Sequence, residues 1–89
     1  MISREVTICN KLGLHARAAS KLVNCASRFT SEIWLQRGER EINGKSIMGV
    51  LTLAAGRGTQ LTVHADGADE AEALDELEKL VEDRFGEDE

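Results

Sequence analysis

The residue of this sequence with the clearest chemical potential is a histidine that stands directly before a helix. His15 follows the turn at residues 10–13, and the helical pattern begins at Ala16 with Arg17 beside it. A helix start carries unpaired N–H groups and about half a positive charge, so it attracts anions, and neutral imidazole is nucleophilic near pH 7. A phosphoryl group on His15 would be held by the amides of Ala16 and Arg17 and by the Arg17 guanidinium. On spacing alone, an ordinary polar histidine in a turn remains the alternative.

The other histidine and the two cysteines are expected to be unremarkable chemically. His64 points outward from the alternating segment 60–66 and has neither an arginine nor a helix start beside it, so we expect a surface histidine. Cys9 and Cys25 lie in apolar patterns and are expected to be buried, inert thiols. None of these residues has metal-ligand spacing, so the sequence predicts no metal site and no cofactor. No serine or cysteine is paired with a base and no carboxylate pair is expected near His15, which argues against a free-standing hydrolase or nuclease.

Seven elements are needed to position His15. Strand-like alternation is found at residues 2–9, 32–36, 40–43 and 60–66. Helical spacing is found at 16–29, in a short apolar helix at 47–54 that Ser46 caps, and in an acidic final helix that Asp69 caps. The expected apolar stripe of the final helix is Ala71, Leu74, Leu77, Val81 and Phe85, and residues 87–89 are expected to be a frayed tail. The order βαββαβα predicts an α+β two-layer sandwich whose sheet is mainly antiparallel, with the helices on one face.

The short helix after Ser46 also predicts a docking surface. Residues 47–54 are apolar on every side, and so short a helix cannot be wholly buried in a protein of 89 residues. We therefore expect Ile47, Met48 and Leu51 to be exposed and to form a patch to which a partner protein docks.

Composition and charge narrow the classes of function. Residues 1–57 hold nine basic and four acidic side chains, whereas residues 58–89 hold two basic and twelve acidic ones. A nucleic-acid binder would be basic throughout and richer in aromatic residues, so nucleic acid is not expected as a partner. The excess of basic side chains in residues 1–57 instead suits binding to a phosphate group or to an acidic protein surface. No segment has the length and apolarity of a membrane span, and no signal-peptide pattern is present. We expect one domain over residues 1–89, in the cytoplasm and without membrane insertion.

Two motifs together resemble a known family. Residues 10–19, Asn-Lys-Leu-Gly-Leu-His-Ala-Arg-Ala-Ala, resemble the active-site signature of HPr, the histidine-containing phosphocarrier of the bacterial phosphotransferase system. Residues 44–50, Gly-Lys-Ser-Ile-Met-Gly-Val, resemble the regulatory segment of that family. The segment 56–59 and the turn at Gly67 before an acidic helix also match, so the resemblance covers essentially the whole chain. It implies an open-faced β-sandwich, in agreement with the predicted order of elements, and it favours the chemical interpretation of His15.

The resemblance also implies partners and roles. His15 would accept a phosphoryl group from phosphorylated enzyme I and pass it to an EIIA domain, with Arg17 as the phosphate partner. The protein would be a monomeric carrier that turns over only with partner enzymes, rather than an enzyme itself. Ser46 would be phosphorylated by the HPr kinase/phosphorylase in organisms that possess it. The docking surface would comprise Ser20, Ile47, Met48 and Leu51.

Some residues depart from the family pattern and leave alternatives open. Many members have proline where this chain has Ala18, and proline is also frequent where it has Lys11. Alanine is an excellent helix former, so function is expected to survive. The segment Asn10–His15 and the acidic tail are similar to the nitrogen-related branch, NPr, so the sequence does not choose between sugar transport and nitrogen-related regulation. The alternative to a carrier is a regulatory binding module, in which phosphorylation of His15 or Ser46 controls docking to a target protein.

Overall fold

The structure is a computed structural model that describes all 89 residues, and it is built on a four-stranded sheet. The strands are β1 (Ile2–Thr7), β2 (Glu32–Arg37), β3 (Arg40–Asn43) and β4 (Gln60–Asp66). They lie in the order β1-β4-β2-β3, and every pairing is antiparallel. Because β4 pairs with β1 on one side and with β2 on the other, His64 lies between Ser3 and Trp34.

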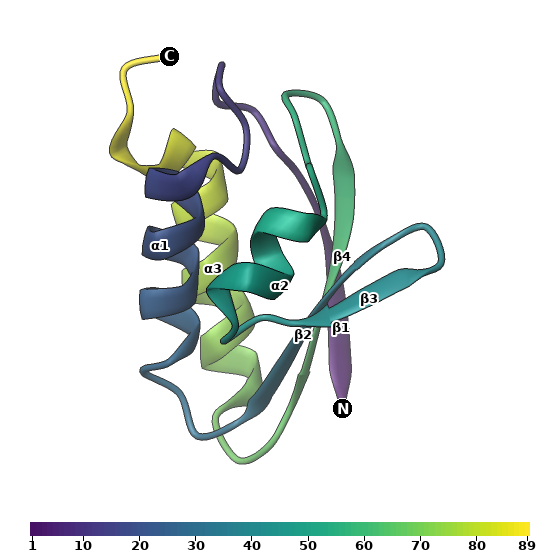
Figure 1. Ribbon diagram of the computed structural model, residues 1–89. Helices are drawn as coiled ribbons and strands as arrows, with labels where there is room; N and C mark the ends of the chain where they lie inside the picture. Colours follow the sequence, from purple (N-terminus) through teal and green to yellow (C-terminus); the bar gives the residue numbers. More distant parts are fainter.

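Three helices cover one face of this sheet and leave the other face open (Figure 1). They are α1 (Ala16–Ala26), α2 (Ile47–Thr52) and α3 (Glu70–Glu82), and a single 3₁₀ turn, η1 (Arg84–Gly86), follows α3. None of these helices is long and apolar enough to cross a membrane. The predicted α+β open-faced sandwich is therefore confirmed.

One hydrophobic core lies between the helices and the sheet, and it contains 22 buried residues. The alternation predicted for β4 is confirmed, because Leu61, Val63 and Ala65 are buried whereas Thr62 and His64 are only partly covered. Burial of this kind stabilises a small domain by roughly 1.5–3 kcal/mol for each large apolar side chain. The core thus fixes the spacing between the sheet and the start of α1, where His15 stands.

Several predicted element ends differ from the structure. The first strand ends at Thr7 rather than Cys9, the first helix at Ala26 rather than Phe29, and the short helix at Thr52 rather than Ala54. The second strand extends to Arg37, one residue beyond its predicted end. After Ala26 the chain continues in tighter turns, in which the amide of Phe29 donates to the carbonyl of Ala26 at 3.2 Å. Phe29 is nevertheless buried, which explains why its spacing matched the helical pattern.

The final helix differs from prediction in its apolar stripe. Ala71 is exposed, and Ala73 takes its place in the core beside Leu74, Leu77 and Val81. The helix begins at Glu70, so Ala71 lies in the first turn on the side away from the sheet, while Ala73 is four residues before Leu77 on the inner side.

Asp69 stands at the predicted N-cap position, but its side chain does not cap α3. Its carboxylate accepts hydrogen bonds from the amides of Thr30 and Ser31, both at 2.9 Å, and from the Ser31 hydroxyl. These donors, led by the Ser31 hydroxyl, lower the pKa of Asp69 to about 2. The residue therefore ties the α1–β2 connection to the start of α3, at the end of the molecule opposite the start of α1 (Figure 1).

Candidate functional site

His15 occupies the N-cap position of α1, as predicted. Its backbone is extended, with φ −75° and ψ 177°, and its side chain makes no capping hydrogen bond, so the ring does not occupy the first amides of the helix. The side chain is 30% exposed. A partly exposed imidazole beside first-turn N–H groups that lack intrahelical acceptors has the arrangement expected for an anion-bearing histidine.

The loop before His15 is held against the segment that follows α2. Gly13 has φ +69°, and a Cβ atom there would lie 2.5 Å from the carbonyl oxygen of Ala55, so only glycine fits without a backbone shift. The amide of Leu14 donates to the same Ala55 carbonyl at 2.8 Å, and the Leu14 side chain is buried. These contacts fix the direction from which the chain enters α1, and hence where the His15 ring lies.

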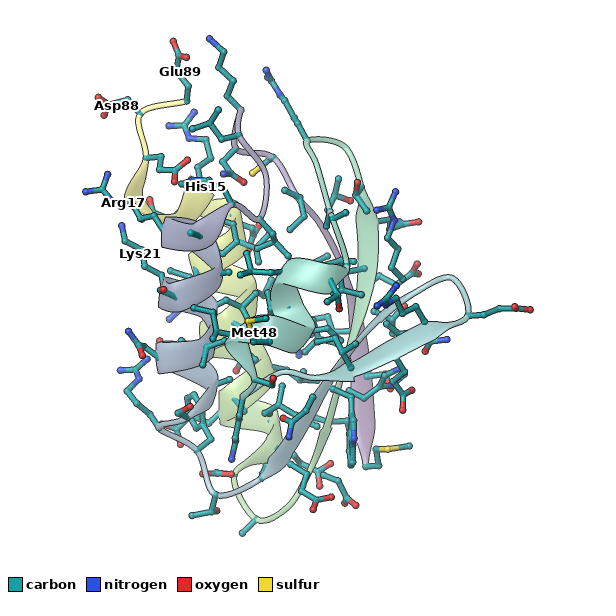
Figure 2. The ribbon with its side chains drawn as sticks, viewed as in Figure 1. His15, Arg17, Lys21, Met48, Asp88 and Glu89 are labelled. Atoms are coloured by element: carbon teal, nitrogen blue, oxygen red, sulfur yellow. The ribbon has the colours of Figure 1, made fainter.

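Arg17 is exposed and makes no hydrogen bond or ion pair. Figure 2 shows it on the same end of the molecule as His15, directed outward from the first turn of α1. Together with Lys11, Leu12 and the tail residues 87–89, these two side chains line a surface hollow. The guanidinium is thus available to an incoming anion, which is compatible with the predicted clamp.

The C-terminal tail is the feature that the sequence interpretation missed. Residues 87–89 are not frayed, because the Glu87 carboxylate lies 2.6 Å from Nε2 of His15 and accepts from Nδ2 of Asn10 at 3.0 Å. Nδ2 of Asn10 also donates to the carbonyl of Gly13 at 2.8 Å, and Asn10 is fully buried. The Asn10 amide, and after it the His15 ring, hold the pKa of the Glu87 carboxyl below its usual value. The expectation of a frayed tail was therefore wrong, and one carboxylate of this tail lies beside His15.

A strained turn directs the tail back to His15. Arg84 and Phe85 both have φ near +55°, and Gly86 has φ +78°. Left-handed backbone costs a non-glycine residue roughly 1–2 kcal/mol. Phe85 is fully buried and its carbonyl accepts from Nζ of Lys21 at 2.6 Å, so packing and a hydrogen bond hold the turn. The only feature of the sequence that could have indicated this turn is an apolar residue followed by glycine, Phe85 and Gly86, after the acidic final helix.

The predicted docking patch is exposed as expected. The exposed fractions are 38% for Ile47, 70% for Met48 and 36% for Leu51, and all three lie on α2. This helix packs beside α1 (Figure 1), and α1 carries the half-buried Ser20. The exposure of the patch is thus confirmed, whereas its docking role stays a prediction.

Ser46 caps α2, as predicted from its position before an apolar run. Its hydroxyl oxygen accepts from the amide of Gly49 at 3.2 Å, and the residue is half-buried. A phosphoryl group on this oxygen would sit at a helix start, next to Ile47 and Met48.

His64 lies on the open face of the sheet, and its surroundings correct a second expectation. The Ser3 hydroxyl is 2.6 Å from Nδ1 of His64, so this serine is paired with a base. Nε2 of His64 lies 2.7 Å from Oε1 of Gln36, whose own amide nitrogen donates to the carbonyl of Gly38. The main-chain amides of β4 are engaged in the two ladders, so no N–H group is free there to stabilise an oxyanion. The serine–histidine contact therefore lacks the rest of a hydrolytic site.

The cysteines and acidic residues do not gather into a metal site. No group of three or more histidine, cysteine, aspartate and glutamate side chains is placed to hold a metal ion. Cys25 is buried, as expected, but Cys9 is only partly buried, and its thiol donates to the carbonyl of Val81 at 3.3 Å.

Comparison with known proteins points to one family. Residues 2–83 match the family model described as "PTS HPr component phosphorylation site". The chain is 52% identical over the full length of both chains to a phosphocarrier protein HPr from Cupriavidus necator. It is 46% identical to a phosphocarrier protein NPr from Shewanella violacea, over 97% of this chain and 94% of that one. A solved structure of HPr from Thermoanaerobacter tengcongensis is 42% identical, covers both chains fully and superposes with a TM-score of 0.96, and another structure of that protein is described as a dimer.

Proposed function

The chain belongs to the HPr/NPr family of phosphocarrier proteins of the bacterial phosphotransferase system, and from that premise we propose that it carries a phosphoryl group on His15. The donor is phosphorylated enzyme I and the acceptor is an EIIA domain. The observation that carries the proposal is the position of His15, which is partly exposed at the start of α1 with Arg17 free beside it. Residues 1–89 act as one carrier domain in the cytoplasm, and the protein works as a monomer that needs its partners for turnover.

The transfer step follows from the chemistry of the ring. The family resemblance implies that the phosphoryl group goes to Nδ1 of His15, the ring nitrogen nearer the main chain. The lone pair of Nδ1 forms a bond to phosphorus while the bond from phosphorus to the leaving atom of enzyme I breaks, and that leaving atom keeps the electron pair. The amides of Ala16 and Arg17 and the Arg17 guanidinium stabilise the negative charge of the phosphoryl oxygens. The onward step to EIIA reverses the roles, because Nδ1 then becomes the leaving atom.

Partner proteins complete this site from outside. A chain of this size has no enclosed cleft, so water must be excluded by the partner, which docks on Ser20, Ile47, Met48 and Leu51. An exposed Met48 suits a surface that receives two different partners, since methionine adapts its shape to each. Phosphorylation of Ser46 by an HPr kinase/phosphorylase would add a charge of about −2 beside this patch and weaken docking of an acidic partner.

A two-step labelling experiment tests the carrier role. Incubation with enzyme I and labelled phosphoenolpyruvate is expected to put the label on the protein, in an acid-labile and base-stable bond. Addition of an EIIA domain is then expected to remove it. A protein that takes no label from enzyme I would contradict the proposal.

The second candidate is a regulatory binding module, and the capping position of Ser46 beside the exposed patch favours it. In that case His15 or Ser46 is phosphorylated as a signal that controls docking to a target. Label that enzyme I adds but no EIIA domain removes would support this candidate over the carrier.

A further inference from the structure

We propose that Glu87 is a positioning residue for His15, which orients the ring and makes Nδ1 its nucleophilic nitrogen. This inference rests on the proposed function, since it concerns how the same histidine is prepared for phosphoryl transfer. The geometric basis is the distance of 2.6 Å between Oε2 of Glu87 and Nε2 of His15.

The hydrogen bond fixes the position of the ring proton. An ionised carboxylate can only accept, so Nε2 must be the nitrogen that carries the proton. In the neutral ring Nδ1 then holds the lone pair, and it has no hydrogen-bond partner, because His15 makes no side-chain capping bond. Carboxylates fix the tautomer and orientation of histidines in other sites by the same geometry.

Glu87 is itself held in place from two sides. Its other oxygen, Oε1, accepts from Nδ2 of the fully buried Asn10, which also holds the carbonyl of Gly13 in the loop before His15. The backbone approaches through the strained turn at Arg84, Phe85 and Gly86, which the buried Phe85 ring anchors. Strain maintained by packing is characteristic of functional positions. The turn brings the tail back toward His15, and the hydrogen bond from Asn10 separately holds the Glu87 carboxylate. Both features favour the contact of this carboxylate with Nε2 of His15.

The charge of Glu87 also suits the transfer step. When Nδ1 bonds to phosphorus, the ring still holds its Nε2 proton and becomes positively charged, and the carboxylate stabilises that charge. When the phosphoryl group leaves for the next acceptor, the electron pair of the N–P bond returns to Nδ1 and the ring becomes neutral again. The proton stays between Nε2 and Glu87 throughout, so the step needs no other acid or base from this chain.

Two readouts on the variant Glu87→Ala test the proposal. Nitrogen-15 spectra of the unphosphorylated, neutral ring are expected to show the proton on Nε2 of His15 in the wild type and a mixture of tautomers in the variant. The rate of phosphoryl transfer from enzyme I is expected to fall about tenfold, the lower range for loss of a group that orients a functional histidine. Glu87→Gln retains a hydrogen-bond acceptor but not the charge. In this variant His15 should keep the tautomer of the wild type, and the transfer rate should lie between those of the wild type and Glu87→Ala.

The matched control is Glu82→Gln, which removes the same charge from an exposed side chain at the end of α3 and should change neither readout. Unchanged ring signals of His64 establish that each variant is folded. A wild-type tautomer ratio or a wild-type rate in Glu87→Ala would overturn the proposal. Absence of transfer to the wild type would instead contradict the proposed function, and the ring spectra would still decide whether Glu87 fixes the tautomer.

Discussion

The two histidines of this chain are both partly exposed, yet their rings are engaged differently. The His15 ring has one nitrogen bonded to Glu87 and the other free, whereas both nitrogens of His64 are engaged, by Ser3 and by Gln36. A nucleophile needs a lone pair that is not shared with a donor. Exposure to solvent therefore does not distinguish the histidine that we propose as the carrier from the other histidine, whereas the hydrogen bonds of the ring nitrogens do.

The surroundings reinforce this difference. His15 stands where N–H groups of a helix start converge and where an arginine has no other partner, while His64 lies in a central strand whose amides are already paired. Only the first environment offers donors to a phosphoryl group. The comparison thus favours the start of α1, rather than the imidazole ring alone, as the feature on which the proposed transfer depends.

Apart from the loss of His15 itself, the largest effect on phosphoryl transfer is expected from Arg17→Ala. This change removes the guanidinium beside His15, a cation that His64 does not have. We expect the rate of phosphoryl transfer to fall about 10- to 100-fold, a somewhat smaller effect than removal of a buried oxyanion-hole donor has on an enzyme. Stability should not change, because Arg17 is exposed and makes no hydrogen bond or ion pair. Single-turnover labelling by enzyme I measures the rate.

Arg40→Ala is the matched control, since it removes the same charge from the exposed edge strand β3. If the two variants slow transfer equally, the arginine acts through the net charge of the protein, and the proposed clamp is wrong.

A smaller effect is expected from Ser46→Asp. Aspartate is a good N-cap residue, so α2 should remain intact, but its charge lies beside the docking patch. Repulsion of about 1 kcal/mol with an acidic partner corresponds to about fivefold slower transfer to His15. Ser46→Asn retains the cap without the charge, and equal rates for the two variants would exclude the electrostatic mechanism.

The smallest effect on transfer is expected at Asp69, which lies at the far end of the molecule. The pKa of Asp69 is lowered to about 2 in the folded protein, so its contribution to stability is complete above its ordinary pKa near 3.8 and is lost as the pH falls toward 2. In Asp69→Asn the free energy of unfolding should therefore depend less on pH over this range, and the rate of phosphoryl transfer should be unchanged. Thermal unfolding between pH 2 and 5 measures the first effect, and a variant as pH-dependent as the wild type would contradict it.

Local patterns were sufficient to predict most of this architecture. The alternation of Leu61 and Val63 and the cap at Ser46 depend on neighbours in the chain, and the structure confirms each of them. The exposure of Met48 followed from size alone, because so short an apolar helix cannot be buried on every side.

The contacts missed by the sequence join residues that are distant in the chain. Glu87 meets His15 across 72 positions, and Ser3 meets His64 across 61. The contact of Glu87 with His15 depends on the left-handed turn at Phe85, and phenylalanine as a residue type has no preference for that conformation. The contact of Ser3 with His64 depends on the register between β1 and β4. Neither contact leaves a periodic pattern in the sequence, so the hydrogen-bond partners of the two histidine rings could be found only from the structure.

We propose that only one of the two histidines carries a phosphoryl group, and labelling of two variants tests this difference most directly. With enzyme I and labelled phosphoenolpyruvate, His64→Ala is expected to take up the label as the wild type does, and His15→Ala is expected to take up none. Label that persists in His15→Ala, or that disappears in a folded His64→Ala, would contradict the account.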